Sequence, residues 1–358
     1  MMNATMFEQF GAAETLVWRE IPTPVPGPDE VLIRLEWAAV NHLDIDIRNG
    51  ESGMAVSLPH VLGTEGTGTI SAVGSMVKDW RIGQRVGTYA FTTCRRCKNC
   101  LLGRQNMCLD IVTLGGQRHG AYAEFVLVRD DQLVEVPDKV SLREALASYK
   151  MATAWEALVE TAALQPDDVL LVTGAGGGVG LSALLLAHRL GAKVIAATGS
   201  DKKNTSLLAL GASHVVNYRS DDLVEAVREL TQGAGVDAVL DVAAGDGLRM
   251  AIAATRPGGR VAVVGAHAGE TVEIDMLDLF RRHISIHGCG RYTTQILRTV
   301  FQKLADGMPA VPVHQEFALA HACEAHRVME SRDFLGRLLL HCGPGKPKKK
   351  PGGTSMQS

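Results

Sequence analysis

The chain has 358 residues, of which 46% are hydrophobic and 21% charged, with a formal net charge of −3. This length predicts two domains with real cores, and the composition excludes a disordered or fibrous protein, while the charge argues against bulk electrostatic binding of nucleic acid. The longest apolar runs, such as residues 261–266, are far shorter than the roughly 20 residues that span a membrane, and no signal-peptide pattern opens the chain, so we expect a cytoplasmic protein without membrane contact.

The first third of the chain is typical of a barrel or sandwich. Four prolines punctuate residues 22–28, and glycines separate the expected strands. Ser141 and Glu144 then form a capping-box sequence, which predicts a helix that includes Tyr149 and Lys150. The strands are expected at residues 31–40, 66–73, 85–90 and 121–128.

From residue 168 onward, apolar runs alternate with amphipathic segments. This βαβ rhythm predicts a parallel sheet with helices on both faces. Gly191 stands where a glycine would end the first of these helices. Strands are expected at residues 169–173, 193–197, 214–218, 236–242 and 260–264, and helices at 178–190, 203–210 and 221–231.

The last part of the chain is mixed in character. Residues 284–289 are interpreted as one more strand and residues 293–307 as a helix. The segment 311–340 is interpreted as completing the first domain. Residues 343–358 are rich in Gly, Pro and Lys, and we expect a disordered tail rather than a phosphate or membrane contact through the lysine run at residues 348–350.

The run Val-Thr-Gly-Ala-Gly-Gly-Gly-Val-Gly at residues 172–180 follows an expected strand and opens an expected helix. Glycines in this context let backbone N–H groups approach a pyrophosphate at the helix N-terminus; the alternative is merely a tight turn. The residues predicted to bind the cofactor here are Gly174, Gly176, Gly177, Gly178, Val179 and Gly180.

The end of the next strand indicates which nicotinamide cofactor is bound. Thr198 stands at the tip, where NAD-binding proteins carry an acidic residue. Ser200, Lys202 and Lys203 follow, and they suit a 2′-phosphate, so the sequence favours NADPH over NADH. Asp201 leaves the alternative open, because a small register shift would bring its carboxylate to the ribose.

Cys94, Cys97, Cys100 and Cys108 lie within one short segment. Four thiolates at this spacing predict a closed tetrahedral zinc site with no position for water, which is structural rather than catalytic. Nearby Arg95, Arg96 and Lys98 would offset its negative charge. The alternative is four buried or redox-active thiols.

Together these residues resemble the medium-chain dehydrogenase/reductase superfamily, which contains the zinc alcohol dehydrogenases and quinone reductases. The resemblance implies an α/β protein: a GroES-like β-barrel catalytic domain in two pieces around a doubly wound Rossmann domain. The implied pieces are 1–148, with the zinc lobe at 91–110, then 149–287 and 288–342. The resemblance rests on residues 41–50, 63–68, the cysteine segment, residues 153–154, the glycine loop and Gly336-Arg337.

The chain departs from the zinc-dependent members where they carry catalytic metal ligands. Asn41, Thr64 and Tyr149 fall at those three positions, and Leu43 replaces the usual hydroxyl of the proton relay. Amides and hydroxyls are poor zinc ligands. The alternative is a metal site rebuilt from neighbouring residues, namely His42, His60 and Asp44.

The resemblance also implies roles for individual residues. Asn41 would lie beside the nicotinamide, and Tyr149, helped by Lys150, would donate a hydrogen bond or proton; the alternative for Tyr149 is a packing residue in the interdomain cleft. The expected cofactor contacts are Thr153 and Gly265 at the nicotinamide, His42 and Arg337 at the pyrophosphate, and Thr198, Ser200, Lys203 and Tyr218 near the ribose phosphate.

The leading hypothesis is an NADPH-dependent reductase of quinones or α,β-unsaturated carbonyl compounds with one structural zinc. Alcohol oxidation needs a Lewis acid, whereas reduction of an activated C=C bond does not. The alternatives are an alcohol or aldehyde dehydrogenase with a rebuilt metal site, and an NADPH-binding protein without turnover. The resemblance also favours a homodimer paired through residues 284–289.

Overall fold

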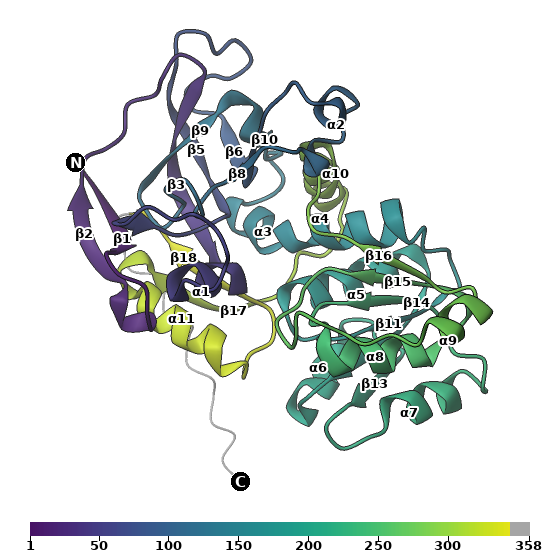
Figure 1. The fold of residues 1–358 in the computed structure, drawn as a ribbon. Helices are drawn as coiled ribbons and strands as arrows, with labels where there is room; N and C mark the ends of the chain where they lie inside the picture. Colours follow the sequence, from purple (N-terminus) through teal and green to yellow (C-terminus); the bar gives the residue numbers. More distant parts are fainter. Residues whose placement is uncertain (344–358) are drawn as a thin grey trace.

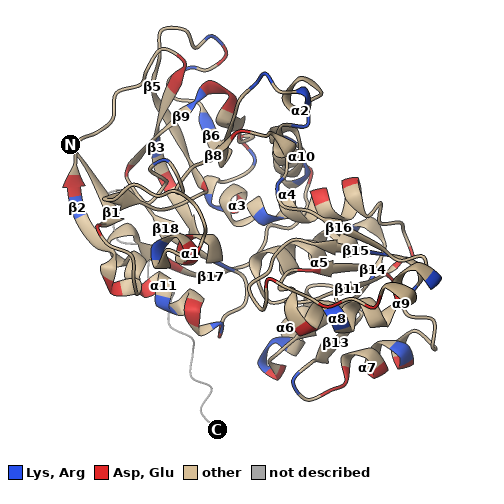
Figure 2. Cartoon of the chain, viewed as in Figure 1, with Lys and Arg blue, Asp and Glu red and all other residues tan. Residues whose placement is uncertain are grey.

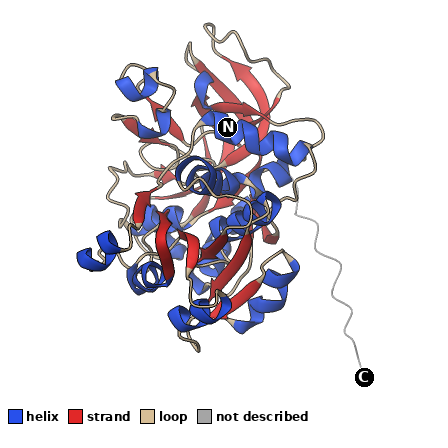
Figure 3. Ribbon diagram, turned by 90° about the vertical axis from the view of Figure 1, so that its right-hand side faces the viewer, coloured by secondary structure: helices blue, strands red, loops and turns tan. Residues whose placement is uncertain are grey.

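The βαβ rhythm from residue 168 onward forms a six-stranded parallel sheet with helices on both faces (Figures 1 and 3). The structure is a computed structural model and describes residues 1–343. Counted along the chain, the strand order is 3-2-1-4-5-6, which is the dinucleotide-binding order. The strands are β13 (His214–Asn217), β12 (Lys193–Thr198), β11 (Val169–Val172), β14 (Val236–Asp241), β15 (Thr255–Val263) and β16 (Ser285–Gly288).

The helices of this half follow the predicted pattern, with two additions. Gly191 ends the first helix in a left-handed conformation with φ of 89°, as expected for a glycine at that position. The helices are α5 (Gly178–Leu190), α6 (Asn204–Ala209) and α7 (Leu223–Leu230), together with α8 (Gly245–Ala254) and α9 (Met276–Arg281), which were not predicted.

The first third of the chain forms the β-rich half, as predicted (Figure 1). Its long central strand β3 (Glu30–Val40) pairs with several partners and is buried over most of its length, with Arg34 and Glu36 exposed. The expected strand at 121–128 begins only at Phe125. The other strands are β5 (Gly66–Val73), β6 (Arg85–Thr88), β9 (Phe125–Arg129) and β10 (Leu133–Glu135), with β1 (Met2–Phe7), β2 (Val17–Ile21) and β4 (His60–Val61) in a separate small sheet.

The end of the chain returns to this half. Strand β18 (Arg337–His341) pairs antiparallel with β3, and β17 (Val313–Ala318) pairs with β18. In Figure 1 these yellow elements and α11 (Ala322–Ser331) lie beside the purple start of the chain. The domain boundaries at 148/149 and 287/288 stay predictions, and the tail expected at 343–358 lies outside the described residues except for Gly343.

Three short helices lie beside the junction of the halves. Asn41 is the N-cap of α1 (His42–Asn49), and its backbone N–H donates to the Asp44 carboxylate over 2.8 Å. The helix predicted from Ser141 is capped by Ser141 and Glu144 as expected. It is interrupted at Ser148, so that α3 (Leu142–Ala147) and α4 (Tyr149–Trp155) are separate helices.

The cysteine segment forms a small lobe between two paired strands, β7 (Phe91–Thr93) and β8 (Ile111–Thr113). The lobe contains one short helix, α2 (Lys98–Leu101), and it contacts the start of α10 (Thr294–Ala305). Gln105 Nε2 donates to Thr294 Oγ1 over 2.7 Å, and Asn106 Nδ2 donates to the Arg291 carbonyl over 3.2 Å. The lobe is therefore hydrogen-bonded to the segment that connects the two halves.

One hydrophobic core crosses the junction and joins the halves. It runs from Trp37 and Tyr89 of the β-rich half through α3, α4 and α10 to the inner face of α5 and the parallel sheet. Basic and acidic residues are both distributed along the elements of the two halves (Figure 2). Among the described residues, no helix combines the length and the apolar character that crossing a bilayer requires.

Candidate active site

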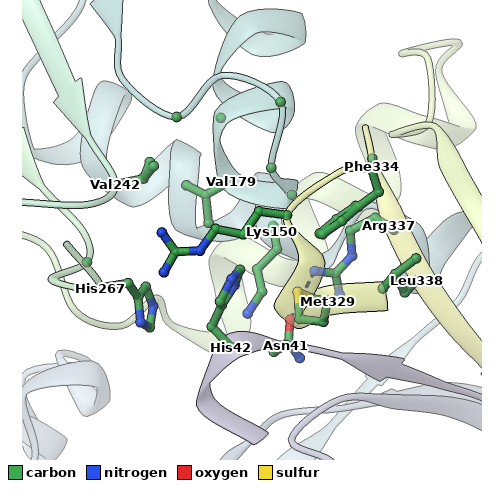
Figure 4. A pocket seen from close by; sticks show the side chains of 18 of the residues that line it. Asn41, His42, Lys150, Val179, Val242, His267, Met329, Phe334, Arg337 and Leu338 are labelled. Carbon is green, nitrogen blue, oxygen red and sulfur yellow. Dashed lines mark hydrogen bonds between the residues drawn. The ribbon is translucent and has the colours of Figure 1, made fainter. Parts of the chain in front are cut away.

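A pocket of about 630 Å³ lies where the two halves meet (Figure 4), a volume typical of cofactor and substrate sites. Its walls come from the start of α1, the loops after β11, β12 and β13, and the loop after α11. The structure brings every predicted cofactor residue to this pocket: His42, Thr153, Gly174, Gly176, Gly177, Gly178, Val179, Gly180, Thr198, Ser200, Lys203, Tyr218, Gly265 and Arg337.

The glycine loop is shaped so that side chains are excluded from it. Gly174 has φ of +59°, and a Cβ there would lie 2.5 Å from a Val242 methyl. A Cβ on Gly180 would lie 2.5 Å from the Gly174 carbonyl oxygen. The loop thus presents bare backbone at the N-terminus of α5, which fits the pyrophosphate of a dinucleotide.

Arg337 reaches the same place from the other half of the chain. The Gly336 N–H donates to the Gly176 carbonyl over 3.1 Å, so the strand carrying Arg337 is fastened to the glycine loop. A Cβ on Gly178 would lie 2.9 Å from Arg337 Nη1, and Arg337 Nε is buried without a partner among the described residues. A buried unpaired donor beside a phosphate-binding loop is explained if it donates to the cofactor.

Cationic side chains, namely Lys202, Lys203 and Arg219, line the pocket near the end of β12. Tyr218 Oη and Arg219 Nε both approach Gly199, at 2.8 and 3.0 Å from the position of a Cβ. Lys203 Nζ donates to the Arg332 carbonyl over 3.2 Å, and burial lowers its pKa. Asp201 does not line the pocket; its carboxylate accepts from Asn217 and Asn204 instead.

Two of the positions expected to replace metal ligands face each other at the base of the pocket. Asn41 Nδ2 donates to Thr64 Oγ1 over 3.3 Å, and both residues are buried. Asn41 Oδ1 accepts from Arg337 Nη1 over 3.0 Å. The amide and the hydroxyl are therefore part of a hydrogen-bond network among protein groups.

Glu65 completes this network with two cations. Its Oε1 lies 2.7 Å from Lys150 Nζ, and its Oε2 lies 2.5 Å from Arg337 Nη2. Burial by itself raises the pKa of Glu65, but Lys150 and Arg337 outweigh it, so the pKa lies below its usual value. Glu65 is thus an anion compensated by two positive charges.

Tyr149 does not reach the pocket. It is fully buried, its ring packs against Phe301, and its hydroxyl donates to the Gly66 carbonyl over 3.1 Å. Burial raises the pKa of this hydroxyl well above its usual value. Lys150, the next residue, lines the pocket instead, so the structure supports the alternative in which Tyr149 is a packing residue.

The residues considered for a rebuilt metal site are not brought together. His42 lines the pocket and stacks near His267 at 4.9 Å between ring centroids, and burial, reinforced by His267, lowers its pKa to about 4. His60 and Asp44 lie outside the pocket lining. Among residues 1–343, the four cysteines are the one group of three or more His, Cys, Asp or Glu side chains arranged to hold a metal ion.

The cysteine cluster fits zinc. The four Sγ atoms lie within 4.8 Å of one another, and the Cys94–Cys100, Cys97–Cys108 and Cys94–Cys108 pairs are 4.0, 4.0 and 3.5 Å apart. A tetrahedral zinc site with Zn–S bonds of about 2.3 Å requires separations of about 3.8 Å. Backbone N–H groups point at the sulfur atoms, as from Cys97 to Cys94 over 3.3 Å.

One expected neighbour of the cluster behaves differently. Arg95 was expected to offset the negative charge of the zinc site. Its Nη2 instead pairs with Asp130 Oδ1 over 2.6 Å, and its Nε pairs with Asp131 Oδ2 over 2.7 Å. Its pKa is raised by these hydrogen bonds. Backbone N–H groups of Cys94 and Cys97 donate to sulfur atoms of the cluster, whereas Arg95 pairs with carboxylates outside it.

Several residues that line the pocket were not predicted from the sequence. Arg219 and His267 follow strands whose ends were correctly placed, so their positions at the carboxyl edge of the sheet were a usable signal. Met329, Arg332 and Phe334 come from the loop after α11, which carries no motif. This loop covers the glycine loop from the opposite half of the chain.

The fold and this pocket define a dehydrogenase or reductase with a GroES-like half and a dinucleotide-binding half. Residues 27–138 match the alcohol dehydrogenase GroES-like domain family, and residues 178–306 match the zinc-binding dehydrogenase family. The chain therefore belongs to the medium-chain dehydrogenase/reductase superfamily and is an oxidoreductase.

Relatives of two activities resemble the chain. A quinone oxidoreductase of Salmonella typhimurium is 32% identical over 95% of this chain and 99% of its own. Alcohol dehydrogenase 2 of Caenorhabditis elegans is 30% identical over 80% of this chain and 81% of its own. The crystal structure of an NAD-dependent alcohol dehydrogenase superposes with a TM-score of 0.90 at 36% identity, over 96% of this chain and all of that one.

Proposed function

We propose that the chain is an NADPH-dependent reductase of quinones or α,β-unsaturated carbonyl compounds, with one structural zinc. The observation that carries the proposal is the hydrogen bond between Asn41 and Thr64 at the base of the pocket. Zinc prefers thiolate, imidazole or carboxylate ligands. The carboxylate present, Glu65, is already compensated by Lys150 and Arg337.

A reaction that suits the residues at the base of the pocket is hydride addition to an activated double bond. NADPH, when bound, supplies the hydride. Thr153, Val179 and Gly265 line the pocket beside the expected nicotinamide and restrict its position. Leu43 and Phe91 line the pocket without offering an acid or base, which suits an apolar substrate.

The preference for NADPH is supported by the charges at the end of β12. Lys203 and Arg219 both line the pocket there, and Asp201 is held in hydrogen bonds away from it. A 2′-phosphate would be stabilised by two cations and the Tyr218 hydroxyl. The ribose 2′-hydroxyl of NADH would lack the acidic partner that this fold ordinarily provides.

The test follows NADPH oxidation by the purified protein with panels of quinones, enones, aldehydes and ketones, and the reverse reaction with alcohols. We expect turnover of quinones or enones that persists after treatment with a chelator. Oxidation of alcohols that a chelator abolishes would support the dehydrogenase with a catalytic metal instead. Tight NADPH binding without turnover of any compound would support the non-catalytic alternative.

The homodimer is also part of the proposal. Strand β16 is the last strand of the parallel sheet, and Met276, Leu277 and Phe280 of the neighbouring α9 are exposed. An open strand edge beside exposed apolar side chains favours pairing with a second copy. Sedimentation of the wild-type protein and of a Met276→Glu/Phe280→Glu variant tests this; a dimer that the substitutions leave intact would contradict this interface.

A further inference from the structure

The cluster at the base of the pocket carries one positive charge more than its carboxylate neutralises. Glu65 is 3% exposed and pairs with both Arg337, which is 4% exposed, and Lys150. One carboxylate balances one of these two cations. Positive charge in a largely buried site favours an anion or a strong acceptor, which the cofactor pyrophosphate can supply beside Arg337 and a substrate carbonyl oxygen beside Lys150.

Lys150 is the member of this cluster that a substrate can reach. Its side chain is 22% exposed, and in Figure 4 it extends into the pocket between His42 and Arg337 toward Asn41. Two donors of Arg337 are engaged by Asn41 and Glu65. The Lys150 amine carries three N–H groups when charged. Among the described residues it pairs with Glu65.

Of the other cations that line the pocket, Arg332 lies near His42 and reinforces the burial that lowers the pKa of that imidazole, and Lys202 pairs with Asp333 over 3.7 Å. Lys203 and Arg219 approach the end of β12, where the cofactor's ribose phosphate is expected. His42 has a pKa of about 4 and is neutral near pH 7. Lys150 belongs to α4, one helical turn before Thr153, which also lines the pocket.

We infer that Lys150 is a catalytic residue, which donates a hydrogen bond and then a proton to the carbonyl oxygen of the substrate. The inference rests on the proposed reduction of enones or quinones. It assigns to this amine the electrophilic task that a Lewis acid has in metal-dependent carbonyl chemistry. Glu65 acts as a positioning residue that holds the amine at the base of the pocket.

The step balances in atoms and electrons. Hydride adds to the β-carbon of the enone, the C=C electron pair moves toward oxygen, and negative charge develops on that oxygen. A Lys150 N–H bond breaks as the O–H bond forms, which leaves an enol and a neutral amine. The amine regains a proton from water, and the enol becomes the saturated ketone. With a quinone, hydride adds to one carbonyl oxygen, negative charge develops on the other oxygen, and the same proton transfer from Lys150 to that oxygen gives the hydroquinone.

The double pairing of Glu65 explains how the amine can lose a proton inside the protein. When Lys150 becomes neutral, Arg337 remains bonded to Glu65. The buried carboxylate is then still compensated, so the transfer leaves no isolated buried charge.

The experiment compares Lys150→Met, Lys150→Arg and Lys150→Ala with the wild-type protein and with Lys303→Met, which replaces an exposed lysine of α10. We expect Lys150→Met to lower kcat on the order of 100-fold or more, with NADPH affinity changed less than about threefold by fluorescence titration. Lys150→Arg should retain substrate affinity better than Lys150→Met, because it keeps the charge. Lys303→Met should match the wild type.

Addition of ethylamine to Lys150→Ala separates a chemical role from a structural one. We expect kcat to rise with the amine concentration, because the small amine enters the space left by the side chain and donates the proton. A Lys150→Met enzyme with wild-type kcat, or an alanine variant that ethylamine does not activate, would overturn the role of Lys150. A wild-type protein that reduces neither enones nor quinones would overturn the proposed function itself.

Discussion

The Asn41 amide donates to the Thr64 hydroxyl over 3.3 Å, and the same Asn41 side chain accepts from Arg337 over 3.0 Å. One amide thus joins two segments of the β-rich half to the strand that returns at the end of the chain. Its donor and its acceptor atoms are both used within the protein. The base of the pocket is therefore an organised hydrogen-bond network with a positive surplus.

The first prediction concerns metal content. Purified protein is expected to contain one zinc per chain, because the cysteine cluster offers four thiolates at zinc spacing. Cys97→Ser/Cys100→Ser should lose this zinc and lower the melting temperature, measured by elemental analysis and thermal denaturation. Cys289→Ser is the matched control, since Cys289 lies outside the cluster. A second tightly bound zinc per chain would contradict the interpretation of Asn41 and Thr64.

The second prediction concerns the cofactor. Lys203→Ala and Arg219→Ala should each weaken NADPH binding about ten- to hundredfold, because each removes a charged donor near the phosphate. NADH binding should change little. Lys193→Ala, at the exposed start of β12, should affect neither cofactor. Binding is measured by fluorescence titration with both cofactors, and equal weakening of the two would argue against a 2′-phosphate site.

The third prediction concerns stability. Glu65→Gln leaves Lys150 and Arg337 without their shared carboxylate, so the free energy of unfolding should fall by about 3–5 kcal/mol. Removing one of the two cations as well, in Glu65→Gln/Lys150→Met, should restore part of the loss. Urea denaturation at constant pH measures both changes. If Glu65→Gln alone were as stable as the wild type, the two ion pairs would contribute nothing to the stability of the fold.

The fourth prediction concerns pH and a buried chain of hydrogen bonds. Arg48 can only donate, so Nδ1 of His326 accepts its bond over 3.0 Å, and Nε2 donates to the Tyr122 hydroxyl over 3.1 Å. Tyr122 in turn donates to Asp44 over 3.4 Å. Burial, reinforced by Arg48, lowers the pKa of His326 from 6.5 to about 3.

The sign of the effect follows from these values. Between pH 6.5 and about 3 the unfolded chain binds a proton at His326 that the folded chain does not, so this stability is lost on acidification. Asp44 acts in the opposite direction, because burial raises its pKa from 3.8 to about 7. Removal of this histidine removes its contribution to the pH dependence. With His326→Gln, the free energy of unfolding should fall on acidification less steeply than in the wild type, by about 1.4 kcal/mol per pH unit in this window.

The measurement is denaturation at several pH values between 4 and 6, a range within the window. His214→Gln replaces an exposed histidine of β13 and should leave the slope unchanged. An unchanged slope in His326→Gln would show that His326 takes up its proton in the folded state as readily as in the unfolded one.

Features that lie close together in the sequence were predictable without the structure. The spacing from Cys94 to Cys108 is short enough for one lobe to bring the sulfur atoms together. The run from Gly174 to Gly180 needs only its own strand and helix to form the phosphate loop. Such motifs depend on local backbone geometry, so the superfamily, the fold class and the cofactor loop could be read from the residues.

Whether Tyr149 acts in the pocket or packs in the core could not be decided in this way. The two residues are adjacent on a helix, where one step turns the side chain by about 100°. Packing against Phe301 places Tyr149 in the core, and Lys150 then faces Glu65 and the pocket. Which helix face meets the pocket is decided by the neighbouring elements, and the resemblance carried only the position in the chain.

The sequence by itself determined the class of the protein: an oxidoreductase with a phosphate-binding loop and a four-cysteine lobe. Only the tertiary structure decided which side chains share the base of the pocket. Glu65 and Arg337 are 272 residues apart, and Asn41 and Arg337 are 296 apart. Contacts of that range depend on β18 pairing with β3, and the register of that pairing places Arg337 where its charge meets Glu65.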